Sequence, residues 1–139
     1  MDNRTLQVQI YRMENETERL QKELVEAKDV YDIICECEQK SRICNDNFHQ
    51  SIELRRKKLE DYTYLTSVSK FARGYNAHMH QLLTGGDYSV AFERANQIKE
   101  TLSLKKEEME NEIESLKARI REKEQQIQRL RSAVNSGEG

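Results

Sequence analysis

Three cysteines and a histidine lie close together in the first half of the chain, and such residues could hold a metal ion. Cys35 and Cys37 are followed by Cys44 and His49. Zinc sites usually take their thiolates from paired Cys-x-x-Cys motifs, which this spacing does not match. On a helix, positions 35 and 37 also point about 200° apart. Because Cys37 and Cys44 share a helix face, we expect buried or half-buried free thiols in a small apolar core role, and no metal site.

Other residues with the potential for acid–base or phosphate chemistry are scattered. His78 and His80 are two residues apart, so on a helix their side chains do not converge. The basic run Arg55–Lys58 has acidic neighbours on both sides, which favours a solvated helix face over a DNA-binding region. We find no glycine-rich phosphate loop and no set of nucleophile, base and orienting group. We therefore predict no catalytic, cofactor-binding or metal residues, no enzyme activity and no nucleic-acid partner.

The composition favours long helices. Of the 139 residues, 35% are charged, and the chain contains no proline and no tryptophan. Charged residues and leucine in a helical period are typical of coiled coils. The net charge of −2 gives no overall attraction to nucleic acid or to an anionic membrane, and no apolar run approaches the ~20 residues of a membrane span. The odd number of cysteines and the lack of a signal-peptide pattern predict reduced thiols and a cytoplasmic location.

Apolar residues at heptad spacing predict the helices. The clearest row lies in the second half, with Lys123 in one core position, and comprises Met109, Ile113, Leu116, Ile120, Ile127, Leu130 and Val134. A row near the N-terminus, with Thr17 in one position, comprises Leu6, Ile10, Met13, Leu20, Leu24, Ala27, Tyr31 and Ile34. A third row comprises Phe48, Ile52, Leu59, Tyr62, Leu65, Val68, Ala72, Tyr75, Met79 and Leu82.

The double glycine Gly85-Gly86 is the strongest break between these rows. Glycine adopts the left-handed conformation that ends helices, and Asp87 can cap a following helix. We therefore predict one all-α domain over residues 1–139, a long antiparallel helical hairpin or coiled coil. Its parts are a helix at 4–83, a turn at 84–87, a helix at 88–134 and a frayed tail at 135–139. Asn47 and Gln50 resemble a capping box and leave open a kink near Asn45–Asn47.

A second helix of that length pairs only with residues from about 38 onward, which leaves the N-terminal row unpaired. Such a row would bind a partner helix or a second copy, unless a kink folds it back into a three-helix bundle. Apolar bulk on both sides of the glycines either closes the hairpin end or docks on another helical protein. The candidate partner-binding residues are Leu6, Ile10, Met13, Leu20, Leu24, Tyr75, Met79, Tyr88 and Phe92.

One set of residues follows a particular order and spacing: Tyr31, Phe48, Leu59, the stretch Phe71–Leu82, Gly85-Gly86, Phe92 and a closing helix rich in Glu, Lys, Ile and Leu. In this order and spacing the chain resembles, over about residues 6–134, the YwqH-like small helical proteins of Bacillota. These proteins are similar to WxG-type hairpins and are associated with type VII secretion and LXG toxin gene clusters. The resemblance implies a cytoplasmic, non-enzymatic adaptor or chaperone that binds the helical N-terminal region of an LXG-type toxin, or another small hairpin protein.

Two departures from WxG-type proteins concern export. The chain has no Trp-x-Gly turn, and its tail Ser132–Gly139 has no aromatic residue for the export signal. These departures favour a cytoplasmic location, and secretion by the type VII system is the alternative. The alternative function is a structural coiled-coil homodimer that acts as a spacer or tether. Both functions depend on helices that bury apolar rows only when they associate.

Overall fold

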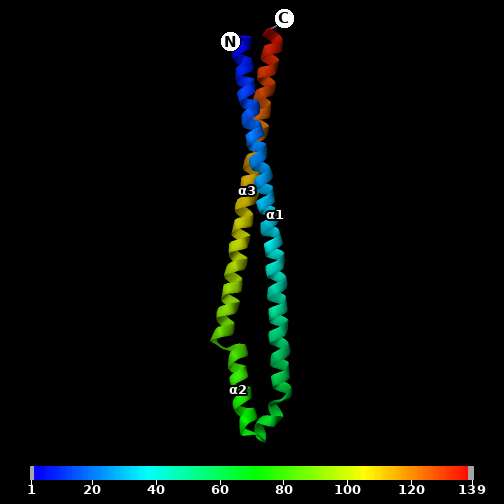
Figure 1. The fold of residues 1–139 in the computed structure, drawn as a ribbon, viewed down its shortest axis with the longest axis vertical. Helices are drawn as coiled ribbons and strands as arrows, with labels where there is room; N and C mark the ends of the chain where they lie inside the picture. The colour runs from blue at the N-terminus through cyan, green and yellow to red at the C-terminus, as the bar shows by residue number, and fades with distance from the viewer. Residues whose placement is uncertain (1, 138–139) are drawn as a thin grey trace. The chain divides into compact units, whose positions relative to one another are not determined.

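The computed structural model describes residues 2–137, except the side chain of Leu65, and the fold is an all-α helical hairpin (Figure 1). Its elements are α1 (Asn3–Asp61), the 3-10 helix η1 (Thr63–Ser67), α2 (Lys70–Thr84) and α3 (Gly86–Gly137). The chain forms two compact units. The first unit combines Met1–Cys35 with Lys105–Gly139, and the second unit is Glu36–Leu104.

α1 is one unbroken helix, so the kink near Asn45–Asn47 and the three-helix bundle that depends on it are wrong. At its start a carboxylate oxygen of Asp2 accepts a hydrogen bond from the backbone N–H of Thr5 at 2.7 Å. This bond holds the pKa of Asp2 below its usual value. Each asparagine costs at most about 0.7 kcal/mol in helix propensity relative to alanine. That cost is too small to break a helix whose flanking turns continue without interruption.

The chain reverses at residues 62–69, so the predicted reversal at 84–87 is wrong (Figure 1). In the second unit Nη2 of Arg56 donates to the carbonyl of Leu83 at 2.8 Å. The Tyr88 hydroxyl lies 3.2 Å from Nδ1 of His49. These contacts place the end of α1 beside both α2 and the start of α3, which is possible only if the reversal precedes α2.

Hydroxyl side chains build this reversal without glycine or proline. The Thr63 hydroxyl donates to the carbonyl of Leu59 at 3.1 Å, which satisfies a group that the end of α1 leaves without a helical partner. Two further hydroxyls in η1 donate to carbonyls three residues back. Ser69 then caps α2, since its side chain accepts from the N–H of Ala72 at 3.2 Å. Side chains therefore provide the hydrogen bonds that end one helix and begin the next.

The double glycine marks a helix boundary as predicted, but the chain continues past it in the same direction (Figure 1). The N–H of Gly85 donates to the carbonyl of Gln81 at 2.6 Å, and the carbonyl of Gly85 accepts from Ser89 at 3.2 Å. A Cβ at position 85 would overlap the Gln81 carbonyl oxygen. Its φ of −85° is open to any residue, so this close approach is what requires glycine.

In the first unit the N-terminal and C-terminal rows pack against each other. Leu6 and Leu20 are only 7% and 1% exposed. The central cluster comprises Leu20, Ala27, Ile113, Leu116 and Ile120, bordered by Leu24, Tyr31 and Met109. The prediction that the N-terminal row has no intrachain partner is therefore wrong. An earlier reversal gives α3 the length to reach the N-terminal part of α1.

The two polar residues predicted within these rows are accommodated by specific contacts. Nζ of Lys123 lies 2.8 Å from a carboxylate oxygen of Glu16, and this partner holds the pKa of Glu16 below its usual value. Thr17 is buried, and its hydroxyl donates to the carbonyl of Met13 at 2.8 Å. Each polar side chain thus has a partner at the edge of the apolar core, as such positions require.

The ends of α3 differ from the prediction. The helix begins at Gly86 instead of residue 88, and it continues to Gly137 through most of the tail predicted to fray at 135–139. Residues 138 and 139 lie outside the described range. Near its end Val134 is buried, which explains why the helix persists there.

Candidate partner-binding surface

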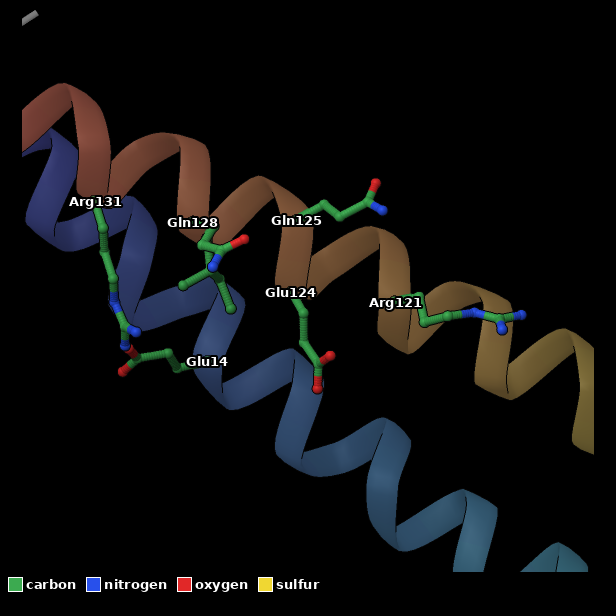
Figure 2. Close-up of a pocket in the computed structure, with 7 residues that line it drawn as sticks. Glu14, Arg121, Glu124, Gln125, Gln128 and Arg131 are labelled. Atoms are coloured by element: carbon green, nitrogen blue, oxygen red, sulfur yellow. The ribbon is translucent and has the colours of Figure 1, made fainter.

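A groove of about 470 Å³ on the first unit is lined mainly by charged and amide side chains (Figure 2). Arg131 reaches the neighbouring helix and forms an ion pair with Glu14. Arg121 and Gln125 extend away from that helix. Exposed ion pairs of this kind contribute little to binding or stability.

The N-terminal candidates are not available to a partner in the way that was predicted. Leu6 and Leu20 are buried, and Ile10, Met13 and Leu24 are half-buried along the same face of α1. A partner could bind this row only by displacing α3. The first unit is therefore a closed helical pair.

In the second unit, two of the four remaining candidates close the hairpin. Ile52, Leu59 and Leu83 form a buried cluster, and Met79 and Tyr88 pack against it. The other two candidates, Tyr75 and Phe92, are exposed. The third predicted row fails in α2 at Tyr75 and Leu82, because Leu83 is the position that faces the core. The side chain of Leu65, also in that row, lies outside the described residues.

Tyr88 is the centre of an aromatic cluster. Its ring stacks on Phe48 with centroids 5.9 Å apart, and it lies 6.3 Å from the ring of Phe92. His49 meets Phe92 edge to face at 5.4 Å. Such pairs favour offset or edge contacts because of the ring quadrupole. Phe48 and Phe92 stay exposed on their outer sides, so the cluster is only partly covered.

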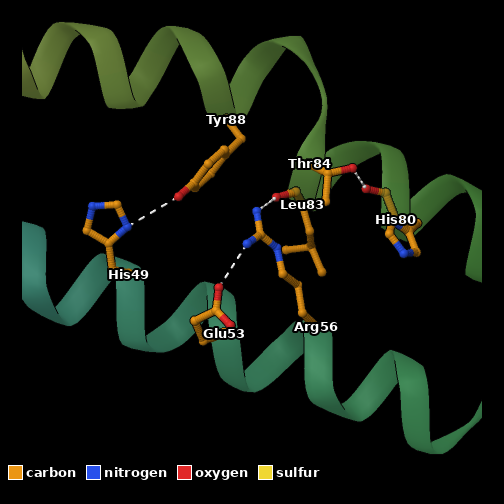
Figure 3. A network of polar contacts seen from close by, with 7 residues as sticks. All are labelled: His49, Glu53, Arg56, His80, Leu83, Thr84 and Tyr88. Carbon is orange, nitrogen blue, oxygen red and sulfur yellow. Dashed lines mark hydrogen bonds and ion pairs between the residues drawn. The ribbon is translucent and has the colours of Figure 1, made fainter.

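Arg56 connects α1 to the end of α2 (Figure 3). Its guanidinium donates to Glu53 and to the carbonyl of Leu83, both at 2.8 Å. Its Cζ lies 5.0 Å from the centre of the Tyr88 ring. The carbonyl of Leu83 belongs to the last turn of α2, where helical partners are lacking. Arg56 is thus a structural residue, in contrast to the solvated face predicted for the whole basic run.

The middle of the second unit is poorly packed. We call residues 36–51 of α1 and 86–104 of α3 the open pair. No residue in either segment is buried. A groove of about 330 Å³ lies there, lined by Glu38, Ser41, Arg42, Asn45, Asp46, His49, Asn96, Lys99, Leu102 and Ser103. Apart from Leu102, this lining is polar, whereas a closed coiled coil carries rows of leucine or isoleucine between its helices.

Besides the aromatic cluster, an exposed apolar region surrounds the chain reversal. We call residues 55–75 the tip. Its exposed large apolar side chains are Tyr62, Tyr64, Val68, Phe71 and Tyr75. Phe71 and Tyr75 stack with ring centroids 6.5 Å apart. The third predicted row placed Tyr62 and Val68 in the core, which their exposure shows to be wrong. Of the five, only Tyr75 was among the predicted partner-binding residues. Apolar spacing continues through this segment although the helix does not, so periodicity alone gave no sign of the exposure.

The cysteines are more exposed than predicted. Cys37 and Cys44 are exposed and Cys35 is half-buried, so the core role expected for the first two is wrong; all three are free thiols. In the first unit the Cys35 thiol, together with burial and Glu110, raises the pKa of Tyr31 to about 12. The Tyr31 hydroxyl donates to a Glu110 carboxylate oxygen at 3.2 Å, which favours the neutral phenol.

The histidines take part in separate local contacts. His78 lines a shallow groove at the junction of α2 and α3, while the backbone carbonyl of His80 accepts from the Thr84 hydroxyl at 2.6 Å (Figure 3). Within residues 2–137, no three His, Cys, Asp or Glu side chains are grouped so that they could hold a metal ion.

In the same range no helix has an apolar stretch long enough to cross a bilayer. No protein-family model, curated protein or solved structure matches this chain. The exposed surfaces that could bind a partner in the second unit are the open pair with its aromatic cluster and the tip.

Proposed function

We propose that the protein is a non-enzymatic helical adaptor, and that its open pair takes up an amphipathic helix of a partner protein. One observation carries this proposal. Neither helix of the open pair buries a single side chain over its length, although the same chain builds a closed core in the first unit. The aromatic cluster of Phe48, His49, Tyr88 and Phe92 is partly exposed, and a third helix would supply the apolar contacts that bury it, as in helical bundles.

The side chains around the open pair indicate what such a helix would carry. Phe48 and Phe92 offer apolar anchors of the kind that dominate interfaces. Asn45 and Asn96 line the intervening groove and can donate and accept hydrogen bonds. The complementary partner is a helix with an apolar stripe interrupted by polar groups.

The resemblance to YwqH-like proteins makes the helical N-terminal region of an LXG-type toxin our first choice of partner. A small hairpin protein is the second choice. The free thiols support a cytoplasmic location for this complex. A second copy of the chain in the open pair would instead support the homodimeric spacer.

Leucine substitutions that fill the groove of the open pair test the proposal. Asn45→Leu combined with Lys99→Leu places leucine on both sides of the groove. We expect a higher melting temperature, because the pair closes on itself, and at least tenfold weaker binding of a toxin N-terminal region encoded beside the gene. Val25→Leu on the first unit is the matched control and should change neither. Light scattering with size exclusion measures complex and self-association together.

Unchanged toxin binding by the filled variant would exclude the open pair as the adaptor surface. A stable homodimer of the unaltered protein that the filled variant loses would favour the spacer instead.

A further inference from the structure

The tip carries the three most exposed of the large apolar side chains among the described residues. Phe71 is 83% exposed, Val68 is 79% and Tyr64 is 67%. Large apolar side chains gathered at one exposed place mark an interaction site more often than singly scattered ones do. None of these three side chains belongs to the buried cluster of the second unit. Packing of the second unit therefore does not explain why these three positions carry large apolar side chains.

The tip is a protruding surface. Tyr64 lies in η1, Val68 follows it, and Phe71 lies in the first turn of α2, so these side chains surround the point where the chain reverses (Figure 1). A rigid protein partner would need a socket shaped to each of them. A lipid interface adapts its shape, and it is where tyrosine is enriched in membrane proteins.

The charge of the tip is opposite to that of the rest of the chain. Residues 55–75 contain six Lys and Arg against two Asp and Glu, a net charge of +4. The whole chain has a net charge of −2, which leaves −6 for the remainder. The two acidic residues, Glu60 and Asp61, are included in this balance. The tip is thus a basic patch on an acidic protein.

Five of the six basic residues are available to a ligand. Arg55, Lys57, Lys58, Lys70 and Arg73 are exposed and form no ion pair with any residue in the described range. Only Arg56 is engaged, with Glu53 and Leu83. Arg55 lies within about 10 Å of the end of α1 at ~1.5 Å per residue, a distance comparable to one Debye length in physiological salt. All five charges can therefore act on one surface at the tip.

We propose that the tip docks on an anionic membrane surface. Val68 and Phe71 enter the interfacial layer, Tyr62 and Tyr64 lie at headgroup level, and the exposed lysines and arginines face anionic lipid headgroups. Exposed apolar side chains surrounded by basic residues are the combination that binds such surfaces, and neither feature alone gives stable attachment. This inference goes beyond the adaptor role and uses residues outside the open pair.

Vesicle flotation with the full chain tests the proposal. The protein should float with phosphatidylcholine vesicles that contain about 30% phosphatidylserine and remain behind with pure phosphatidylcholine. Binding should weaken steeply as salt rises from about 0.1 M to about 0.5 M. Absence of binding to the anionic vesicles overturns the proposal and favours an acidic protein socket. Equal binding to both compositions overturns the assigned role of charge.

Two sets of variants separate the contributions. Lys58→Gln with Lys70→Gln and Arg73→Gln should weaken binding about a hundredfold, since each basic residue near an anionic surface accounts for about fivefold. Val68→Ser with Phe71→Ser should weaken it at least tenfold without loss of helix content, because both side chains are exposed. Tyr11→Ser on the first unit, also at an exposed position, should have no effect.

A single tryptophan gives a direct readout, because the chain has none of its own. In Phe71→Trp the fluorescence should shift to the blue on anionic vesicles and be quenched by brominated lipid. In Tyr11→Trp the fluorescence should remain as it is in solution. A blue shift in that variant, or no shift in Phe71→Trp, contradicts the proposal. The filled open-pair variant should bind vesicles normally, and the Val68 and Phe71 variant should bind the toxin region normally. Failure of one proposal is thus distinguishable from failure of the other.

Discussion

Leu20 is the most deeply buried large side chain among the described residues, and it shows how much depends on single positions in the closed pair. It packs in the cluster with Ala27, Ile113, Leu116 and Ile120. Two helices alone leave most of their surface in water, so each fully buried side chain accounts for a large share of the core. Residues such as Arg56 then add contacts that the apolar rows do not provide.

Leu20→Ala should lower the free energy of unfolding by about 2–5 kcal/mol, the usual range for truncating a buried leucine. Val25→Ala, at an exposed position five residues away, should change it by no more than about 0.5 kcal/mol. Chemical denaturation followed by circular dichroism measures both. Equal small effects would mean that the N-terminal row is not packed against α3.

Tyr31 should titrate later than an ordinary tyrosine. Its pKa is raised from 10.0 to about 12, chiefly by Cys35 and then by burial and Glu110. Because the folded state holds this proton more tightly, the associated stability is present below pH 10 and is lost as pH rises toward 12. Absorbance titration of tyrosinate should show a late step that Tyr31→Phe removes. Loss of an earlier step instead would contradict the assignment.

At the scale of elements, the two chain breaks have different physical origins. The reversal depends on hydroxyl groups that cap two helix ends, whereas the junction of α2 and α3 depends on one close backbone approach at Gly85. Gly74 lies inside α2 with nothing near its missing Cβ. The glycines of this region therefore have unequal importance.

Gly74→Ala should raise the stability by about 0.5–1 kcal/mol, since alanine costs less entropy than glycine inside a helix. Gly85→Ala should lower it, because the added Cβ overlaps the Gln81 carbonyl. Thermal unfolding of the two variants provides the comparison. If both alanines stabilise the protein, then α2 and α3 fuse readily into one helix and the junction has no structural role.

Apolar periodicity correctly predicted the helical segments and the buried faces of the first unit, but it predicted the wrong face of α2, where Leu83 is the buried residue. It did not predict the reversal, because the run Tyr62–Ser69 contains neither glycine nor proline. The feature of this run that marks the reversal is the low helix propensity of its consecutive Thr, Ser, Tyr and Val residues. Heptad rows can pair in more than one register, and the observed register also buries Leu6 and Leu20. The apolar area that a register buries depends on both helices together, so no local sequence pattern reveals it.

The same dependence limited prediction of the interaction surface. A reversal at the double glycine would leave the N-terminal row unpaired, whereas the observed reversal at residues 62–69 pairs it with α3. Tyr75 remains exposed because Leu83, and not Tyr75, lies on the core-facing side of α2. Phe92 does face His49 of α1, but no buried residue surrounds it there. The sequence did not predict the open pair, because its defining feature is a lack of buried residues relative to the first unit.

At the scale of the whole molecule, the position of the reversal determines which residues are neighbours. Spin labels at Gln50 and Ser89 test it, in a variant whose three cysteines are replaced by serine. These sites adjoin His49 and Tyr88, so the helix axes should be on the order of 10 Å apart. A reversal at the double glycine would separate the labels by about 50 Å at ~1.5 Å per residue. Electron paramagnetic resonance distinguishes the two.

The closed pair also has a mechanical consequence. A Cβ on Gly137 would lie 3.1 Å from Oδ1 of Asn3, so residues 3 and 137 are adjacent at one end of the first unit. A load applied between them would pull the helices apart like a zipper, breaking contacts one heptad at a time from the end where Leu6 and Val134 are buried. A load directed along the helices would have to shear many contacts at once. The first unit should therefore yield easily to forces that separate its ends and resist forces along its axis.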